Sequence, residues 1–374
     1  MNKDKIKYIY FLTQIKNLGN VRIKHILTYY PEAFSAFNVT KEVLKKIEGI
    51  DEKSANSIIE SEKHFKKYEV EFEQLVNKLR KNGIKVTSLI SDNYPKNLKK
   101  IYDAPIILYY KGSLNDLDKY SLGIIGTRTP TVYGQTVCEN LTSEITKLGI
   151  LTVSGMARGI DSIAHKTTLK YSGLTYAILG SGVDVIYPPE NRSLYNEILN
   201  TGAVISEYEP GEKPDKINFP KRNRIISGIS LGTLIIETAK KGGSLITSEF
   251  ALDQNKEVFA IPGNINSKKS EGTNELIKKG TAKLVTNIDD ILSELNYALK
   301  PILNDKAKEN EQHISVELDI FERKIFEELS NEPIHIDRIN ELTGMSISDC
   351  LVHLLSLEFK NVIKQLPGKY FVKM

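Results

Sequence analysis

Short apolar runs recur at regular spacing between residues 122 and 295, and this recurrence constrains the fold more than any other feature of the sequence. Most runs are separated by segments with helical periodicity, such as Val137, Leu141 and Ile145. Apolar strands that alternate with helices form a parallel sheet with helices on both faces. The sequence therefore predicts an α/β fold with an extended Rossmann-like, doubly wound parallel sheet. The expected strands are Leu122–Ile125, Ile150–Val153, Tyr176–Leu179, Ala203–Ile205, Thr233–Ile236, Val258–Ile261 and Lys283–Val285.

The N-terminal residues 1–66 are predicted to form a separate helical domain. They contain glycine turns at Gly19 and Gly49, each followed by an amphipathic helical run. The pattern resembles a pair of helix-hairpin-helix units, related to sterile-alpha-motif-like (SAM-like) modules. Such glycines either serve only the turn between two helices, or let backbone N–H groups hold a DNA phosphate. The sequence is consistent with both interpretations, a structural turn and a phosphate contact.

Three further segments complete the predicted organisation. Residues 67–298 are assigned to the Rossmann-like domain, because the mixed helix and strand pattern before residue 115 indicates an extension of that domain. Residues 299–313 are polar and contain a proline, so they are expected to form a linker. Residues 314–374 show the order helix, strand, helix, turn, helix, hairpin, which resembles a winged helix.

Composition limits the function classes. The 374 residues carry a net charge of only +4, so any binding of nucleic acid must depend on local clusters of cations. The two cysteines, Cys138 and Cys350, are far apart in sequence, which excludes a disulfide framework or a thiolate zinc site. No apolar stretch approaches the roughly 20 residues that span a bilayer. A cytoplasmic protein without membrane contact is expected.

The loops that follow the first two predicted parallel strands combine glycines with arginines. Ligands of open parallel sheets bind beyond the carboxyl ends of the strands. Glycines allow an anion to approach the backbone, helix N-termini direct N–H groups at it, and arginine suits phosphate. The sequence therefore predicts an anion site at this edge of the sheet. Its expected residues are Gly126, Thr127, Arg128, Ser154, Gly155, Ala157, Arg158, Gly159 and Asp161.

A second cluster of cations lies in residues 213–224, which hold five positive charges and one negative charge. An aromatic side chain among cations suits a nucleic-acid base stacked beside its phosphate. The alternative is a solvated basic loop, although Phe219 and two prolines are unusual in one. The residues expected to contact nucleic acid are Phe219, Lys221, Arg222, Asn223 and Arg224, together with Gly243 and Ser244, which open a later helix.

Enzyme readings find less support in the sequence. It contains no G-x-x-x-x-G-K-[ST] phosphate loop, and Gly180-Ser181-Gly182 lacks the third glycine of a dinucleotide fingerprint. Asp161 and His165 lie four residues apart and share a helix face, where they form either an acid–base pair or a structural contact. No catalytic residue, cofactor or metal site is predicted.

The ordered motifs between about residues 85 and 290 resemble those of the DNA-processing protein A (DprA/Smf) family. The motifs are Gly126–Arg128, Ser154–Asp161 with Ala164-His165, Tyr187-Pro188, Ser206–Tyr208, Phe219–Ile226, Gly243–Thr247 and Phe259–Gly263. The resemblance implies a cytoplasmic homodimer that binds and protects incoming single-stranded DNA, and that loads the RecA recombinase onto it during natural transformation. It also implies that Arg128 and the Gly155–Asp161 loop line the strand pocket, that Phe219–Arg224 adds phosphate contacts, and that Arg192 contributes.

Two alternative functions remain. The same fold superfamily contains nucleotide N-glycosidases of the "lonely guy" type, whose Gly-Gly-x-Gly-Thr-x-x-Glu motif ends in a carboxylate. Here Glu237 falls one residue late, which turns it to the other face of its strand. Alternatively, the winged helix reads duplex DNA, but its candidate recognition helix, residues 346–360, carries a net charge of −1. A partner-binding or oligomerisation role is expected there instead.

Overall fold

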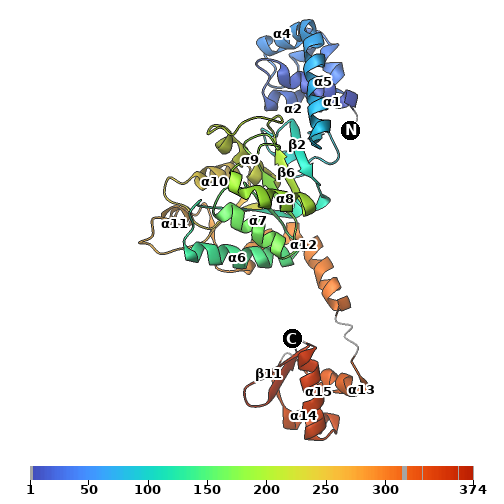
Figure 1. Ribbon diagram of the computed structural model, residues 1–374, viewed down its shortest axis with the longest axis vertical. Helices are drawn as coiled ribbons and strands as arrows, with labels where there is room; N and C mark the ends of the chain where they lie inside the picture. Colours follow the sequence, from blue (N-terminus) through green and yellow to red (C-terminus); the bar gives the residue numbers. More distant parts are fainter. Residues whose placement is uncertain (1–2, 314–317, 331, 361, 374) are drawn as a thin grey trace. The chain divides into compact units, whose positions relative to one another are not determined.

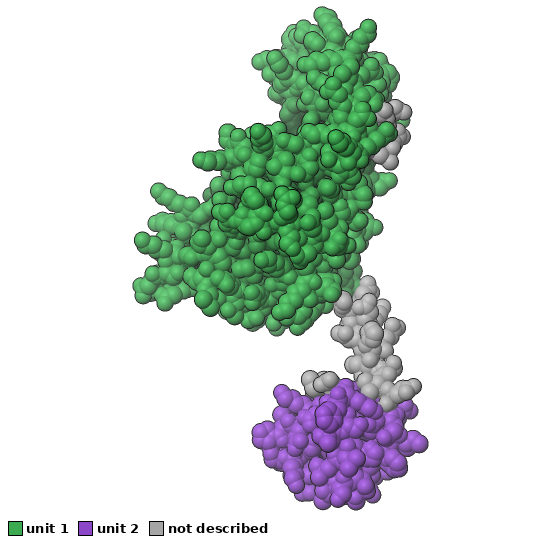
Figure 2. Space-filling model, viewed as in Figure 1, with its two compact units in different colours: residues 1–302 green, residues 303–374 purple. Residues whose placement is uncertain are grey.

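The computed structural model describes residues 3–313, 318–330, 332–360 and 362–373. The chain divides into two compact units, residues 1–302 and residues 303–374 (Figure 2). The first contains the large sheet and the N-terminal helices, and the second contains a small sheet and the C-terminal helices.

Unit 1 is built on a nine-stranded sheet with the order β1-β2-β6-β5-β4-β3-β7-β8-β9. Strands β3 to β9 are parallel to one another, whereas β2 is antiparallel to both β1 and β6. Each apolar run predicted as a strand overlaps an observed strand, so the predicted doubly wound sheet is confirmed. The strands are β1 (Lys85–Ser88), β2 (Ile107–Gly112), β3 (Ser121–Ile125), β4 (Leu151–Ser154), β5 (Thr175–Ile178), β6 (Ala203–Ser206), β7 (Gly232–Ile235), β8 (Glu257–Ala260) and β9 (Lys283–Leu284).

The strand order reverses between β3 and β7, and this switch point positions the site described below. From β3 the chain winds outward to β6 in one direction, and from β7 it winds to β9 in the other. Right-handed crossovers therefore place the helices of the two halves on opposite faces. Figure 1 shows the first set, α6, α7 and α8, side by side, while α9 packs on α10. The helices are α6 (Val132–Lys147), α7 (Ile160–Lys170), α8 (Arg192–Thr201), α9 (Asn218–Ile229), α10 (Gly243–Asp253) and α11 (Glu271–Lys278).

The N-terminal helices share a hydrophobic core with the sheet. Phe11 and Phe72 belong to the same buried cluster as Tyr109 of β2 and Ile178 of β5. The boundary predicted after residue 66 instead falls inside α5, which leads directly into β1. The helices are α1 (Lys3–Gln14), α2 (Asn20–Tyr29), α3 (Lys41–Leu44), α4 (Glu52–Glu60) and α5 (Phe65–Lys81).

One arginine joins the two glycine turns of this helical region. Arg22 donates from Nε to the Gly49 carbonyl at 2.8 Å and from Nη1 to the Asn17 carbonyl at 2.7 Å. Its Nη2 lies 3.2 Å from the Asp51 carboxylate, which also caps α4. Gly49 has φ +77°, a conformation that favours glycine. These contacts favour the purely structural reading of the turns.

The expected linker 299–313 is helical. Helix α12 (Ile288–His313) continues through Pro301 and spans the whole segment. A proline removes one backbone hydrogen bond, but the surrounding lysine, glutamate, alanine and leucine residues favour helix. Among the described helices, none is both long and apolar enough to cross a membrane.

Unit 2 has the element order predicted from the sequence. Its strands pair in the order β10-β12-β11. Ile325, Leu354 and Phe371 lie in its separate hydrophobic core. Gly344 ends α14 with φ +66°, the left-handed conformation common at helix C-termini. The elements are α13 (Ile320–Glu328), β10 (Ile334–His335), α14 (Ile336–Thr343), α15 (Ile347–Phe359), β11 (Ile363–Leu366) and β12 (Tyr370–Lys373).

A buried carboxylate links α13 to α15 in this unit. Glu322 accepts hydrogen bonds from Lys360 Nζ at 2.6 Å, from Ser356 Oγ at 2.6 Å and from the Asp319 backbone N–H at 2.8 Å. Burial raises the pKa of Glu322, but these hydrogen bonds outweigh burial and lower its pKa to about 2. The folded pKa thus lies below the ordinary value of 4.5, so the ionised form stabilises the fold.

We expect Glu322→Gln to destabilise unit 2 at neutral pH by about 1–3 kcal/mol, because the charge-assisted bonds are lost. Hydrogen exchange of the full-length protein, measured by mass spectrometry, should accelerate in α13 and α15 and stay unchanged in unit 1. In the unsubstituted protein the same stabilisation is present above pH 4.5 and is lost as the pH falls towards 2. Glu327→Gln, an exposed position on the same helix, is the control. Equal acceleration in both variants would contradict the assignment.

Candidate nucleic-acid interface

The loops beyond the carboxyl ends of β3, β4 and β7 meet around one cavity at the switch point of the sheet. The cavity measures about 640 Å³ and adjoins a small recess of about 30 Å³. The structure therefore brings most of the predicted site residues to one edge of the sheet. Those that line the cavity or its recess are Gly126, Thr127, Arg128, Gly155, Ala157, Arg158, Asp161, Phe219, Arg222, Asn223, Gly243 and Ser244.

Arg222 of α9 forms the floor of the cavity. Its side chain donates from Nη1 to the carbonyl oxygen of Gly155 at 2.7 Å and to that of Ile178. Only 5% of the residue is exposed, and this burial lowers its pKa to about 10. The guanidinium is therefore still protonated at neutral pH and places a positive charge at the bottom of the cavity.

Asp161, in the first turn of α7, shapes the loop around this arginine. Its Oδ2 accepts hydrogen bonds from the backbone N–H groups of Gly155 at 3.1 Å and Ala157 at 3.3 Å. Burial raises the pKa of Asp161, and the Arg222 charge opposes that rise. Asp161 thus supports the loop and balances part of the Arg222 charge, and its own charge is unsuited to contact a phosphate.

The rim of the cavity carries the accessible cations. Arg128 is exposed and, within the described part of the chain, makes no ion pair. The charge of Arg128 helps to lower the pKa of Arg222, so the two guanidinium groups are close enough to repel each other. Arg158 is paired with Glu190, but both side chains are exposed, and such pairs are weak. Lys216 adds a further exposed cation.

An aromatic pair forms the wall of the recess. The ring centroids of Tyr187 and Phe219 are 5.5 Å apart, with their planes inclined by 35°. Arg128, Arg158 and Arg222 line the same recess. A flat apolar surface beside guanidinium groups can hold a base and its phosphate together.

Two glycines of the second loop are required by close packing. A Cβ atom on Gly155 would lie 2.6 Å from both Nη atoms of Arg222. Gly159 has φ +75°, and a Cβ there would meet the backbone of Thr127 and Arg128. These glycines therefore let the first loop, the second loop and α9 approach one another. A Cβ on Gly243, in contrast, would meet open space, so the N-terminus of α10 is accessible.

The structure places five predicted contact residues outside the cavity. Arg224 is 7% exposed and forms ion pairs with Glu207 and with Asp103, the latter at 3.1 Å. The basic cluster is helical from Asn218, so positions 222 and 224 point in nearly opposite directions. Ser154 is buried and donates from Oγ to the Ile124 carbonyl, and Gly159 packs against the backbone of Thr127 and Arg128. The remaining two, Lys221 and Arg192, are exposed but do not line the cavity.

Sequence reasoning missed several residues of the cavity wall. Tyr187, Lys216 and Thr238 line it but were not among the predicted contacts. Tyr187 belongs to the Tyr187-Pro188 motif and Lys216 lies inside the basic cluster, so the sequence contains a signal for both residues. Thr238 follows the predicted strand that ends near Ile236, and no sequence pattern around it indicates a contact residue.

The residues considered for catalysis are held in structural contacts. Glu237 is buried and accepts from Thr131 N at 2.9 Å and Thr131 Oγ1 at 2.5 Å, at the start of α6. His165 is fully buried with Nδ1 2.6 Å from Thr175 Oγ1, and burial lowers its pKa to about 3. Neither side chain lines the cavity. The geometry therefore does not favour the glycosidase alternative.

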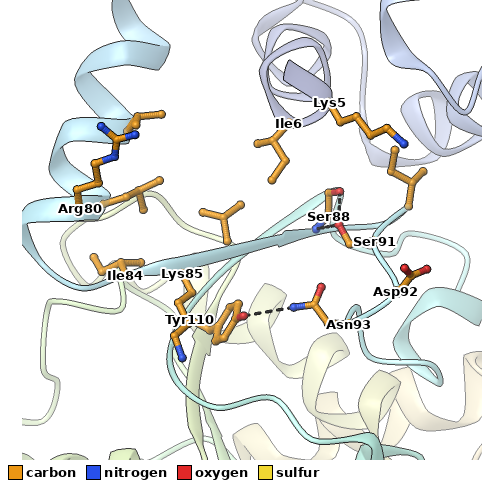
Figure 3. Close-up of a pocket in the computed structure, with 14 residues that line it drawn as sticks. Lys5, Ile6, Arg80, Ile84, Lys85, Ser88, Ser91, Asp92, Asn93 and Tyr110 are labelled. Atoms are coloured by element: carbon orange, nitrogen blue, oxygen red, sulfur yellow. Dashed lines mark hydrogen bonds between the residues drawn. The ribbon is translucent and has the colours of Figure 1, made fainter. Parts of the chain in front are cut away.

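A larger groove of about 780 Å³ lies elsewhere in unit 1, between α1, α5 and β1 (Figure 3). Two of its polar side chains have partners: Asn93 donates to the Tyr110 hydroxyl at 3.2 Å, and Lys85 donates to the Gly112 carbonyl at 2.8 Å. None of the predicted site residues lines it. We therefore assign the candidate site to the cavity formed by the glycine loops, although it is smaller.

The chain is similar to known proteins over most of its length. Residues 85–296 match the family model described as DNA recombination-mediator protein A, and residues 311–369 match that of the DprA winged helix domain. Protein Smf of Synechocystis sp. is 31% identical over 95% of this chain and 96% of its own length. DNA processing protein DprA of Streptococcus pneumoniae is 42% identical over 56% of this chain and 74% of its own length.

Two solved structures share the fold. DNA processing protein A from Streptococcus pneumoniae superposes with a TM-score of 0.66 at 36% identity, covering 77% of this chain and 97% of that one. DNA processing protein A from Helicobacter pylori, described for its single-stranded DNA binding mode, gives a TM-score of 0.52 at 33% identity and covers 57% and 96%. Together with the family models, these similarities establish that the chain belongs to the DprA/Smf family of DNA recombination-mediator proteins.

Proposed function

We propose that this protein binds single-stranded DNA in the cavity at the switch point of the sheet. Phosphates would lie on Arg128, on the buried Arg222 and on the open N-terminus of α10, with a base against the Tyr187–Phe219 pair. The observation that carries the proposal is that a buried, protonated guanidinium and a partly exposed aromatic wall share one recess. The single-stranded DNA binding of the related Helicobacter pylori protein supports it.

The geometry favours a single strand over a duplex. An aromatic wall can stack only a base that has left its own stack, as bases of single strands do. The cations around it hold phosphates without reading sequence, so the binding should be largely independent of base composition. We infer that the protein acts by binding rather than by catalysis, since Glu237 and His165 serve structural contacts.

Family membership extends the proposal to the biological role. The protein would act as a cytoplasmic homodimer during natural transformation, protect the incoming strand, and load the RecA recombinase onto it. An open cavity suits such a transfer, because the strand lies at the surface and each base–aromatic contact is worth only about 1–3 kcal/mol. The strand can therefore be released in small steps.

Arg128→Ala should weaken binding to single-stranded oligonucleotides of every sequence by about 10- to 100-fold, because one charge-assisted phosphate contact is lost. The slope of log affinity against log salt should also decrease by about 0.7. Fluorescence anisotropy with labelled oligothymidine at two salt concentrations measures both. Arg80→Ala, an exposed arginine on α5 outside the cavity, is the matched control. Unchanged affinity in Arg128→Ala would place the DNA elsewhere.

Phe219→Ala should weaken the same binding by about 1–3 kcal/mol while leaving the salt slope unchanged, because stacking releases no counterions. Competition between single-stranded and duplex oligonucleotides should show that most of the preference for single strands is lost with the ring. Tyr102→Ala, an exposed aromatic outside the cavity, serves as control. A changed salt slope in Phe219→Ala would mean that the ring positions a cation instead.

The loading role predicts that this protein shortens the lag before RecA, from the same organism, assembles on an oligonucleotide already coated with single-strand-binding protein. The lag is read from the RecA ATPase. Arg128→Ala should lengthen it in proportion to its loss of DNA affinity, whereas the control Arg80→Ala should not. A lag that the unsubstituted protein does not shorten would reject loading while leaving the DNA-binding proposal intact.

A further inference from the structure

Helix α15 of unit 2 exposes an apolar stripe that the proposed DNA cavity does not explain. One face of the helix is packed into the core through Cys350, Leu354 and Leu357, all fully buried. The outward stripe consists of Ile347, Leu351, Val352, Leu355 and Phe359, which are 44%, 37%, 65%, 54% and 79% exposed. These fractions correspond to roughly 500 Å² of side-chain surface, the size of patches that are often functional.

Nucleic acid is a poor occupant of this stripe. The acidic residues of α15 are Asp349 and Glu358, and the lysine that follows the helix, Lys360, is ion-paired with Glu322 at 2.6 Å. A helix that enters a DNA groove needs cations for the phosphates. The stripe offers apolar side chains instead, which suit a protein surface.

The spacing of the stripe points to a second copy of the same helix. Ile347, Leu351, Leu355 and Phe359 follow one another at intervals of four residues, so they form one ridge along the helix. The ridge has the same spacing when it is traversed backwards. Next to an antiparallel copy, Leu351 therefore faces Leu355 of the second copy and Ile347 faces its Phe359. A two-fold interface requires such self-complementarity.

We propose that the winged-helix unit self-associates through an antiparallel, two-fold pairing of α15 stripes. The two stripes together would bury roughly 1,000 Å², which lies at the lower end of specific interfaces. The association is therefore weak and depends on concentration. It joins chains through unit 2, whereas the DNA cavity lies in unit 1, so the pairing is independent of the proposed DNA binding.

Sedimentation equilibrium of the full-length protein at about 10–200 μM tests the pairing. Leu355→Lys places a charge in the middle of the stripe and should abolish the rise in average mass that the unsubstituted protein shows from the lowest to the highest concentration. Val70→Lys, on α5, is the control, because Val70 is 57% exposed and Leu355 is 54% exposed. Equal masses for the unsubstituted protein and Leu355→Lys, or equal losses in both variants, would overturn the proposal. Unchanged hydrogen exchange in α13 and α15 would verify that Leu355→Lys is folded.

Disulfide trapping tests the antiparallel register. Leu351→Cys and Leu355→Cys chains of different tag length are mixed at high concentration and mildly oxidised. The proposal expects the species that joins the two tags to exceed both same-position dimers several-fold, since position 351 faces position 355 of the second copy. The native Cys138 and Cys350 are buried and provide little background. Equal trapping of all three species, or none, would overturn the antiparallel pairing.

Discussion

The candidate site depends on the burial of one cation. Arg222 leaves water to bond the carbonyl groups of Gly155 and Ile178, and this joins α9 to the ends of β4 and β5. Burying a charge is costly unless it is compensated, and Asp161 supplies only part of that compensation because it also holds two backbone N–H groups. The cavity consequently has a positive charge that a phosphate oxygen can balance. A glycine at position 155 is the steric condition for this arrangement.

Most of the fold, and the convergence of most candidate residues around one cavity, could be predicted because both follow from topology. Apolar strands that alternate with helices leave little choice but a parallel sheet, and the ends of such strands meet at one edge. Gly126, Arg128 and the 155–161 loop therefore converge whatever their detailed contacts. The direction of each side chain in the basic cluster could not be predicted in this way. Pro220 suggests a loop, but it lies in the first turn of α9, where proline is tolerated.

The directions in which the side chains leave α9 then decide the roles of two of its arginines. Arg222 faces the cavity, while Arg224, two residues later, is neutralised by Glu207 and Asp103 on the other side. Domain boundaries were harder to predict for a similar reason. The core that joins Phe11 to Tyr109 is made of contacts between distant segments, which local patterns do not report. The polar segment after residue 299 is helical, because its composition suits a solvated helix as well as a linker.

The contacts of Arg22 have a consequence for how the N-terminal region opens. One guanidinium occupies carbonyl groups from both glycine turns, so neither turn can separate without breaking the bonds of the other. Two sequence motifs that look like independent repeats are therefore joined by a single side chain. Moving one turn away from the other costs about 1 kcal/mol for each Arg22 hydrogen bond that breaks.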